Sequence, residues 1–102
     1  MNDEMKNNDI YLSLKEKLEK LELEELRFKV KYLPCIEDTL KNPIEKWLQK
    51  EANTVLYFNK YENDITIIVK VIDDVLDDFE VIKDNYDYVN SLRRGILLYS
   101  KS

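Results

Sequence analysis

Five acidic residues in the C-terminal third of the chain recur at spacings of three and four. They are Asp73, Asp77, Glu80, Asp84 and Asp87. Because an α-helix turns by about 100° per residue, a helix here would place all five carboxylates on one narrow stripe. With Tyr88 beside it as an aromatic anchor, this stripe is predicted to bind a protein partner as a nucleic-acid mimic. The alternative is an ordinary solvated helix face.

The residue types that most often catalyse reactions are scarce. The chain has no histidine, one cysteine (Cys35) and one glycine (Gly95). A zinc site, a cysteine nucleophile with a histidine base and a glycine-rich phosphate loop therefore have no support. Asp73-Asp74 and Asp77-Asp78 offer oxygen ligands, but no EF-hand calcium loop surrounds them. We expect no catalytic residues, no metal and no cofactor, with Cys35 as a small buried apolar residue.

Length and charge restrict the partners. The 102 residues carry 21 acidic and 16 basic side chains, which gives a net charge of −5. Nucleic acids and anionic membranes both attract clustered cations, so we expect no direct binding to either. This charge favours a basic protein partner, for example a nucleic-acid-binding protein, and a homodimer stays open. The polar N-terminus, the short apolar runs and the single cysteine favour a cytoplasmic protein.

The first half of the chain is predicted to contain two helices and one strand. A polar tail, residues 1–9, comes first. Apolar residues at spacings of three and four then predict a helix over Ile10–Leu23. Alternating apolar and basic residues predict a strand over Leu26–Tyr32. An Asn-Pro start at residues 42–43 predicts a short helix that ends near Ala52.

The second half begins with a predicted hairpin. Its strands are the β-rich runs Thr54–Asn59 and Ile65–Ile72, and its turn contains Asn63-Asp64, which can adopt the left-handed conformation. The helical period then returns and predicts a long helix over residues 74–94. Gly95 follows where a helix often ends on a left-handed residue.

These elements predict one α+β domain over residues 10–102. Ile96–Tyr99 completes it as a closing strand, which gives the order α-β-α-β-β-α-β. We expect a mixed sheet of about four strands packed by three helices.

Two segments also resemble the minimal nucleotidyltransferases. They are Val55–Val69 and Arg94–Tyr99. The resemblance implies a strand, a Gly-Ser turn, a strand with an Asp-x-Asp magnesium motif and a closing strand. In this chain Asn59-Lys60 stands in place of Gly-Ser, and Thr66 replaces the second aspartate. The resemblance therefore implies a related fold that cannot transfer nucleotides.

Composition and patterning together favour a small non-enzymatic binding protein. We expect an inhibitor, antitoxin, immunity protein or phage anti-defence protein that blocks a basic, nucleic-acid-binding partner. Two alternatives stay open. The first is a degenerate nucleotidyltransferase-like domain without catalytic motifs, and the second is a structural subunit of a homodimer.

Overall fold

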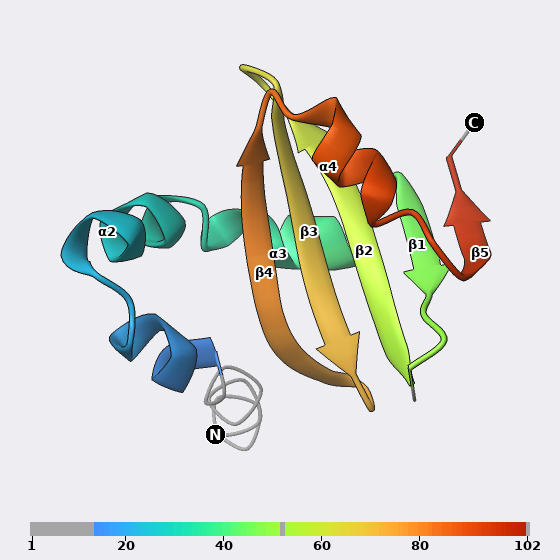
Figure 1. The fold of residues 1–102 in the computed structure, drawn as a ribbon, viewed down its shortest axis with the longest axis horizontal. Helices are drawn as coiled ribbons and strands as arrows, with labels where there is room; N and C mark the ends of the chain where they lie inside the picture. The colour runs from blue at the N-terminus through green and yellow to red at the C-terminus, as the bar shows by residue number, and fades with distance from the viewer. Residues whose placement is uncertain (1–13, 52, 102) are drawn as a thin grey trace.

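The computed structural model describes residues 14–51 and 53–101, which form an α+β fold around one five-stranded sheet (Figure 1). The strands are β1 (Glu45–Leu48), β2 (Thr54–Tyr61), β3 (Ile65–Ile72), β4 (Val75–Lys83) and β5 (Ile96–Ser100). The helices are α2 (Leu23–Lys31), α3 (Pro34–Lys41) and α4 (Tyr86–Ser91), and residues 14–19 are helical as well. The predicted tail, residues 1–9, and the predicted helix start at Ile10 lie outside the described residues.

The predicted fold class is confirmed, but the arrangement of the elements differs. The strand order is β4-β3-β2-β1-β5, and every neighbouring pair is antiparallel. The expected mixed sheet of about four strands and the order α-β-α-β-β-α-β are therefore wrong in detail. Antiparallel neighbours need only short turns, and two such turns join β2, β3 and β4.

Two tight turns, one of three residues and one of two, join β2, β3 and β4. Asn63 and Asp64 have φ of 63° and 59°, which confirms the left-handed turn that the sequence predicts. Asp73 and Asp74 have φ of 51° and 63°, and they form the two-residue turn between β3 and β4, whereas residues 62–64 form a three-residue turn between β2 and β3. Asn and Asp tolerate positive φ better than other residues with side chains, and a two-residue turn with positive φ, such as Asp73-Asp74, fits the twist of a hairpin.

The predicted helix over residues 74–94 is wrong, because β4 occupies its first half. β4 pairs with β3 in antiparallel register, and that register shifts between Lys70 and Val71. Asp77 is the extra residue, so a β-bulge interrupts the alternation of side chains. As a result Leu76 and Phe79, three residues apart, both lie in the same buried cluster. This spacing imitates the period of a helix.

The predicted strand over Leu26–Tyr32 is helix α2 instead. Its first turn carries Glu24 and Glu25 and its last turn carries Lys29, which complements the helix dipole. The rings of Phe28 and Tyr32, four residues apart, are in edge contact at 5.4 Å. Spacing of four brings side chains together on a helix. The same apolar residues that alternate as in a strand therefore also satisfy the helical period.

The predicted helix after Asn42 is also wrong. Asn42 is the C-cap of α3, and its N–H donates to the carbonyl of Asp38 at 2.8 Å. Proline is common just after a helix ends as well as at its first turn, so Pro43 fits either position. The segment that follows is β1, which pairs with both β2 and β5.

Gly95 has φ of +94°, so the predicted positive φ is confirmed, and β5 follows as predicted. Gly95 does not end a helix as predicted, because α4 ends at Ser91 with Leu92 as its C-cap. A Cβ on this residue would lie 2.0 Å from the carbonyl oxygen of Leu48. Only glycine therefore fits where the chain enters the edge strand beside β1.

Each face of the sheet carries its own apolar cluster. One cluster packs β3 and β4 under α3 and the helical residues 14–19, with Ile36, Ile67 and Phe79 essentially buried. The other packs α4 onto the opposite face through Phe58, Ile68 and other residues. Figure 1 shows α3 behind the sheet and α4 in front of it. No helix within the described ranges is long and apolar enough to cross a membrane.

Candidate functional site

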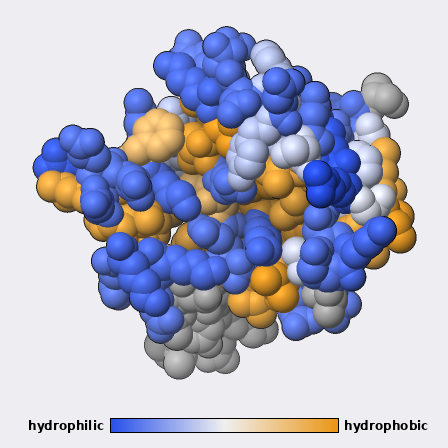
Figure 2. Space-filling view, viewed as in Figure 1, coloured by the Kyte–Doolittle hydropathy of each residue, from blue (hydrophilic) through white to orange (hydrophobic). Residues whose placement is uncertain are grey.

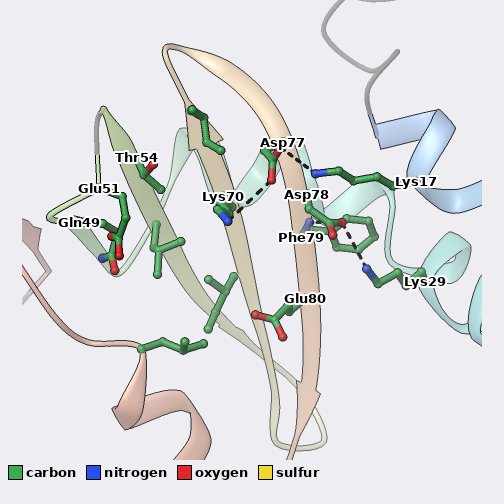
Figure 3. A pocket seen from close by; sticks show the side chains of 14 residues that line it. Lys17, Lys29, Gln49, Glu51, Thr54, Lys70, Asp77, Asp78, Phe79 and Glu80 are labelled. Atoms are coloured by element: carbon green, nitrogen blue, oxygen red, sulfur yellow. Dashed lines mark hydrogen bonds and ion pairs between the residues drawn. The ribbon is translucent and has the colours of Figure 1, made fainter.

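A groove of about 720 Å³ lies on the sheet face that carries α4. Its floor is apolar and includes Leu56 and Ile68, from the two central strands β2 and β3. Charged and polar side chains surround this floor (Figure 3): Lys17, Lys29, Gln49, Glu51, Thr54, Lys70, Asp77, Asp78 and Glu80. In the space-filling view, apolar atoms likewise appear between hydrophilic side chains on this side of the molecule (Figure 2).

Lysines and aspartates face one another along the β4 side of the groove. The Nζ of Lys17 lies 2.7 Å from Asp77, and the Nζ of Lys29 lies 3.3 Å from Asp78. Lys70 approaches the other oxygen of Asp77 only to 3.9 Å, and its side chain is 47% exposed. Of the three, Lys70 is therefore the least tightly paired and the most open to a bound anion.

Glu80 lines the same groove and is held by a tyrosine. The hydroxyl of Tyr88, on α4, donates to the carboxylate of Glu80 at 2.6 Å. This hydrogen bond is the main cause that raises the pKa of Tyr88, and burial and the Glu80 charge add to it. Tyr88 therefore stays protonated and keeps the carboxylate in place. Asn85 caps α4 by accepting from the N–H of Tyr88 at 3.2 Å, which fixes the start of that helix.

The structure separates the six residues that the sequence places on one stripe. Asp77 and Glu80 line the groove, and Tyr88 contacts Glu80. Asp73 lies in the β3–β4 turn, where it accepts from the Asn53 amide at 2.7 Å. The other two, Asp84 and Asp87, are exposed in the turn after β4 and in the first turn of α4. A continuous acidic stripe is therefore absent from the described residues.

No three of the described Asp, Glu, His or Cys side chains come together as a metal site. Asp77 and Asp78 instead face lysine ammonium groups. Sequence reasoning missed the groove itself, along with Lys70 and the two lysines that approach from the helices. The signal that could have found it is the Asp73-Asp74 pair between two β-rich runs, which is typical of a second hairpin.

A second polar cluster lies on the other face of the sheet, around the hydroxyl of Tyr61. This hydroxyl contacts the carboxylate of Asp38 at 2.7 Å, Thr39 at 3.0 Å and the amide of Asn59 at 3.3 Å. Thr39 is fully buried and Asn59 is nearly so, which makes the cluster part of the packing between α3 and β2. Cys35 is half-buried beside it rather than fully buried, and burial and Asp38 raise its pKa.

We predict that the Tyr61 cluster makes the protein lose stability at alkaline pH. Burial is the main cause that raises the pKa of Tyr61 from 10 to about 12; Thr39 opposes the shift and Asp38 adds to it. As the pH rises from 10 to about 12, the unfolded chain releases this proton while the folded chain keeps it. The free energy of unfolding should therefore fall across this range. Urea unfolding at stepped pH measures it, and Tyr61→Phe should show a shallower fall; equal slopes would contradict the prediction.

Comparison with known proteins gives one family match. The PBECR2 family model, described as "phage-Barnase-EndoU-ColicinE5/D-RelE like nuclease2", matches residues 2–100. No curated protein and no solved structure gives a significant match. The matched family is one of nucleases, which points to an enzyme.

The expected non-enzymatic inhibitor or anti-defence protein is therefore wrong, and so is the expectation that the chain is not an enzyme. The match also replaces the nucleotidyltransferase resemblance with a different family. The physical reason for the error about the stripe lies in the fold, because the segment expected to be an exposed helix is strand β4, which places Asp77 and Glu80 at a groove on a sheet. The expected basic partner and the expected lack of direct nucleic-acid binding are not tested by this match.

Proposed function

Because the chain belongs to the PBECR2 family of phage-Barnase-EndoU-ColicinE5/D-RelE like nucleases, we propose that it cleaves RNA in the groove on the α4 face of the sheet. The observation that carries this proposal is the Glu80 carboxylate, which Tyr88 holds at 2.6 Å beside the lysine-lined wall of that groove. A fixed carboxylate and nearby ammonium groups are a base and a set of cations, which are the groups that phosphodiester cleavage requires.

In this proposal Glu80 is the general base. Its carboxylate takes the proton of the ribose 2′-hydroxyl, and the resulting oxygen attacks the adjacent phosphorus. The bond from phosphorus to the 5′-oxygen breaks, and the products are a 2′,3′-cyclic phosphate and a free 5′-hydroxyl. The ammonium of Lys70 stabilises the extra negative charge on the phosphoryl oxygens and donates a proton to the leaving 5′-oxygen.

Several features of the groove favour RNA as the substrate. The 2′-hydroxyl is a nucleophile that the substrate itself brings to the phosphorus, so the protein needs to supply only a base and a cation. The apolar floor of Leu56 and Ile68 offers a surface for an unstacked base.

The net charge of −5 opposes binding to a polyanion. Lys17 and Lys29 are paired with Asp77 and Asp78, so the proposal relies on Lys70, which is the least tightly paired lysine of the groove. Binding should be weak and strongly salt-dependent, and the proposed cytoplasmic location would give access to RNA.

The test compares a fluorescent single-stranded RNA with the same sequence in which one or all riboses are 2′-deoxy. We expect cleavage of the RNA, no cleavage at the deoxy position, and a 2′,3′-cyclic phosphate terminus detected by mass spectrometry. Equal cleavage of RNA and DNA would contradict the 2′-hydroxyl route. Intact RNA at every salt concentration would contradict the proposal as a whole.

A further inference from the structure

A second cavity, of about 290 Å³, lies at the end of the sheet where α3 ends, β1 begins and β5 ends. Three lysines line it: Lys41, Lys46 and Lys101. None of the described Asp and Glu residues belongs to its lining, although acidic residues outnumber basic ones by 21 to 16 in the whole chain. Asp38 contacts one lining residue, since it accepts from the Asn42 amide, and it also accepts from the Tyr61 hydroxyl.

The three lysines are placed by different elements of the fold. Lys41 is in the last turn of α3, and the Nζ of Lys46 lies 5.0 Å from the centre of the Tyr57 ring. The N–H of Lys101 donates to the carbonyl of Ile44 at 2.8 Å, which fixes the chain beside β1. The ion pairs found within the described ranges use other basic residues, namely Lys17, Lys29, Lys70 and Arg93. The positive charge of this cavity is therefore not neutralised by any ion pair seen there.

An aromatic residue completes the lining. Tyr99, from β5, borders the cavity and is 44% exposed. A cluster of cations next to an exposed aromatic ring is typical of sites where a nucleic-acid strand places a phosphate and stacks a base. A small inorganic anion would need only the cations.

We infer that this cavity, defined by Lys41, Lys46 and Lys101, binds a phosphate of a single-stranded nucleic acid outside the cleavage groove, with a base on Tyr99. The inference rests on the proposed nuclease function. Lys46 packs on Tyr57, on the α3 face, whereas the groove lies on the α4 face. A strand that occupies both sites therefore has to cross from one face of the sheet to the other, and the β5 edge offers a short route. From β2 to β5 the sheet is two strand spacings wide, or about 10 Å.

The test measures binding of the full chain to a fluorescein-labelled, single-stranded 2′-deoxy oligonucleotide by anisotropy over a range of salt concentrations. The variant is Lys41→Gln with Lys46→Met and Lys101→Gln, which keeps side-chain bulk. We expect the slope of log K against log salt to become shallower by about 0.7 for each phosphate that no longer meets a lysine. The matched control removes three other exposed lysines, Lys15→Gln, Lys20→Gln and Lys83→Gln, and should keep the slope.

Unchanged slope in the cavity variant, or an equal change in the control, would overturn the inference and leave the cavity to another ligand such as an acidic protein segment. The nuclease proposal is judged separately, by cleavage of RNA by the unaltered chain. Salt-dependent binding that needs the three lysines, without any cleavage, would support this site and contradict the proposed function.

Discussion

Glu80→Gln is expected to lower the rate of RNA cleavage by roughly 10²- to 10⁴-fold, the range that a general base usually contributes. The amide keeps the size of the side chain and can still accept from the Tyr88 hydroxyl, which lies 2.6 Å from the native carboxylate. It cannot take a proton from the 2′-hydroxyl. The measurement is kcat/KM on a fluorescent RNA, with circular dichroism to confirm that the variant is folded. A variant that cleaves at the native rate would show that Glu80 is not the base.

Glu62→Gln is the matched control, because Glu62 is exposed in the turn between β2 and β3, away from the groove. Removing one negative charge there should change the rate little. This control separates the loss of the base from the general effect of a less acidic protein, which by itself would strengthen RNA binding.

Tyr88→Phe tests the positioning of Glu80. The ring stays, but the hydrogen bond that holds the carboxylate is removed. We expect a smaller loss of cleavage rate than in Glu80→Gln, and mainly in kcat, since the base is still present but less well oriented.

The main cause that raises the pKa of Tyr88 is its hydrogen bond to Glu80. The charge of Glu80 raises this pKa as well. The Glu80→Gln variant keeps an acceptor but loses that charge, so the pKa of Tyr88 should move part of the way back towards its ordinary value, which ultraviolet titration can detect.

The sequence predicts some elements of this fold well and others badly, for local physical reasons. The β2–β3 hairpin has uninterrupted β-rich strands and an Asn-Asp turn, so its residues favour one conformation only. In β4 the bulge at Asp77 changes the spacing of buried residues from two to three. The two-residue spacing typical of a strand and the spacing of three to four typical of a helix are then hard to distinguish in the sequence. Only the pairing of this segment with β3 identifies it as a strand.

The candidate site could be predicted only in part for the same reason. Glu80, Asp77 and Tyr88 stand out in the sequence, yet the helix expected there would display them on an exposed face. In the sheet, Glu80 is held beside the groove by a residue eight positions later. Lys17 and Lys29 reach β4 from 60 and 49 positions earlier in the chain. No local pattern contains such contacts, because they arise from the packing of helices against a sheet edge.

The difference between a strand and a helix at β4 can be measured through stability. Phe79 is 1% exposed, whereas Val75, on the same strand, is 47% exposed. A helix over residues 74–94 would put both side chains on the same buried stripe, so truncating either would be costly. Of these two residues, the bulged strand places Phe79 but not Val75 among the buried residues of the α3 face.

Phe79→Ala is therefore expected to lower the free energy of unfolding by about 3–5 kcal/mol, because the ring is removed from a closely packed core and leaves a cavity. The ring also lies 5.1 Å from the ammonium of Lys29, so its removal weakens the contact between α2 and the sheet. Val75→Ala should change this free energy by no more than about 0.5 kcal/mol. Urea unfolding of the two variants beside the native chain measures both values. Since a small domain is stable by only about 5–15 kcal/mol, Phe79→Ala should leave a detectable unfolded population. Equal losses of stability in the two variants would contradict the assignment of β4 as a bulged strand.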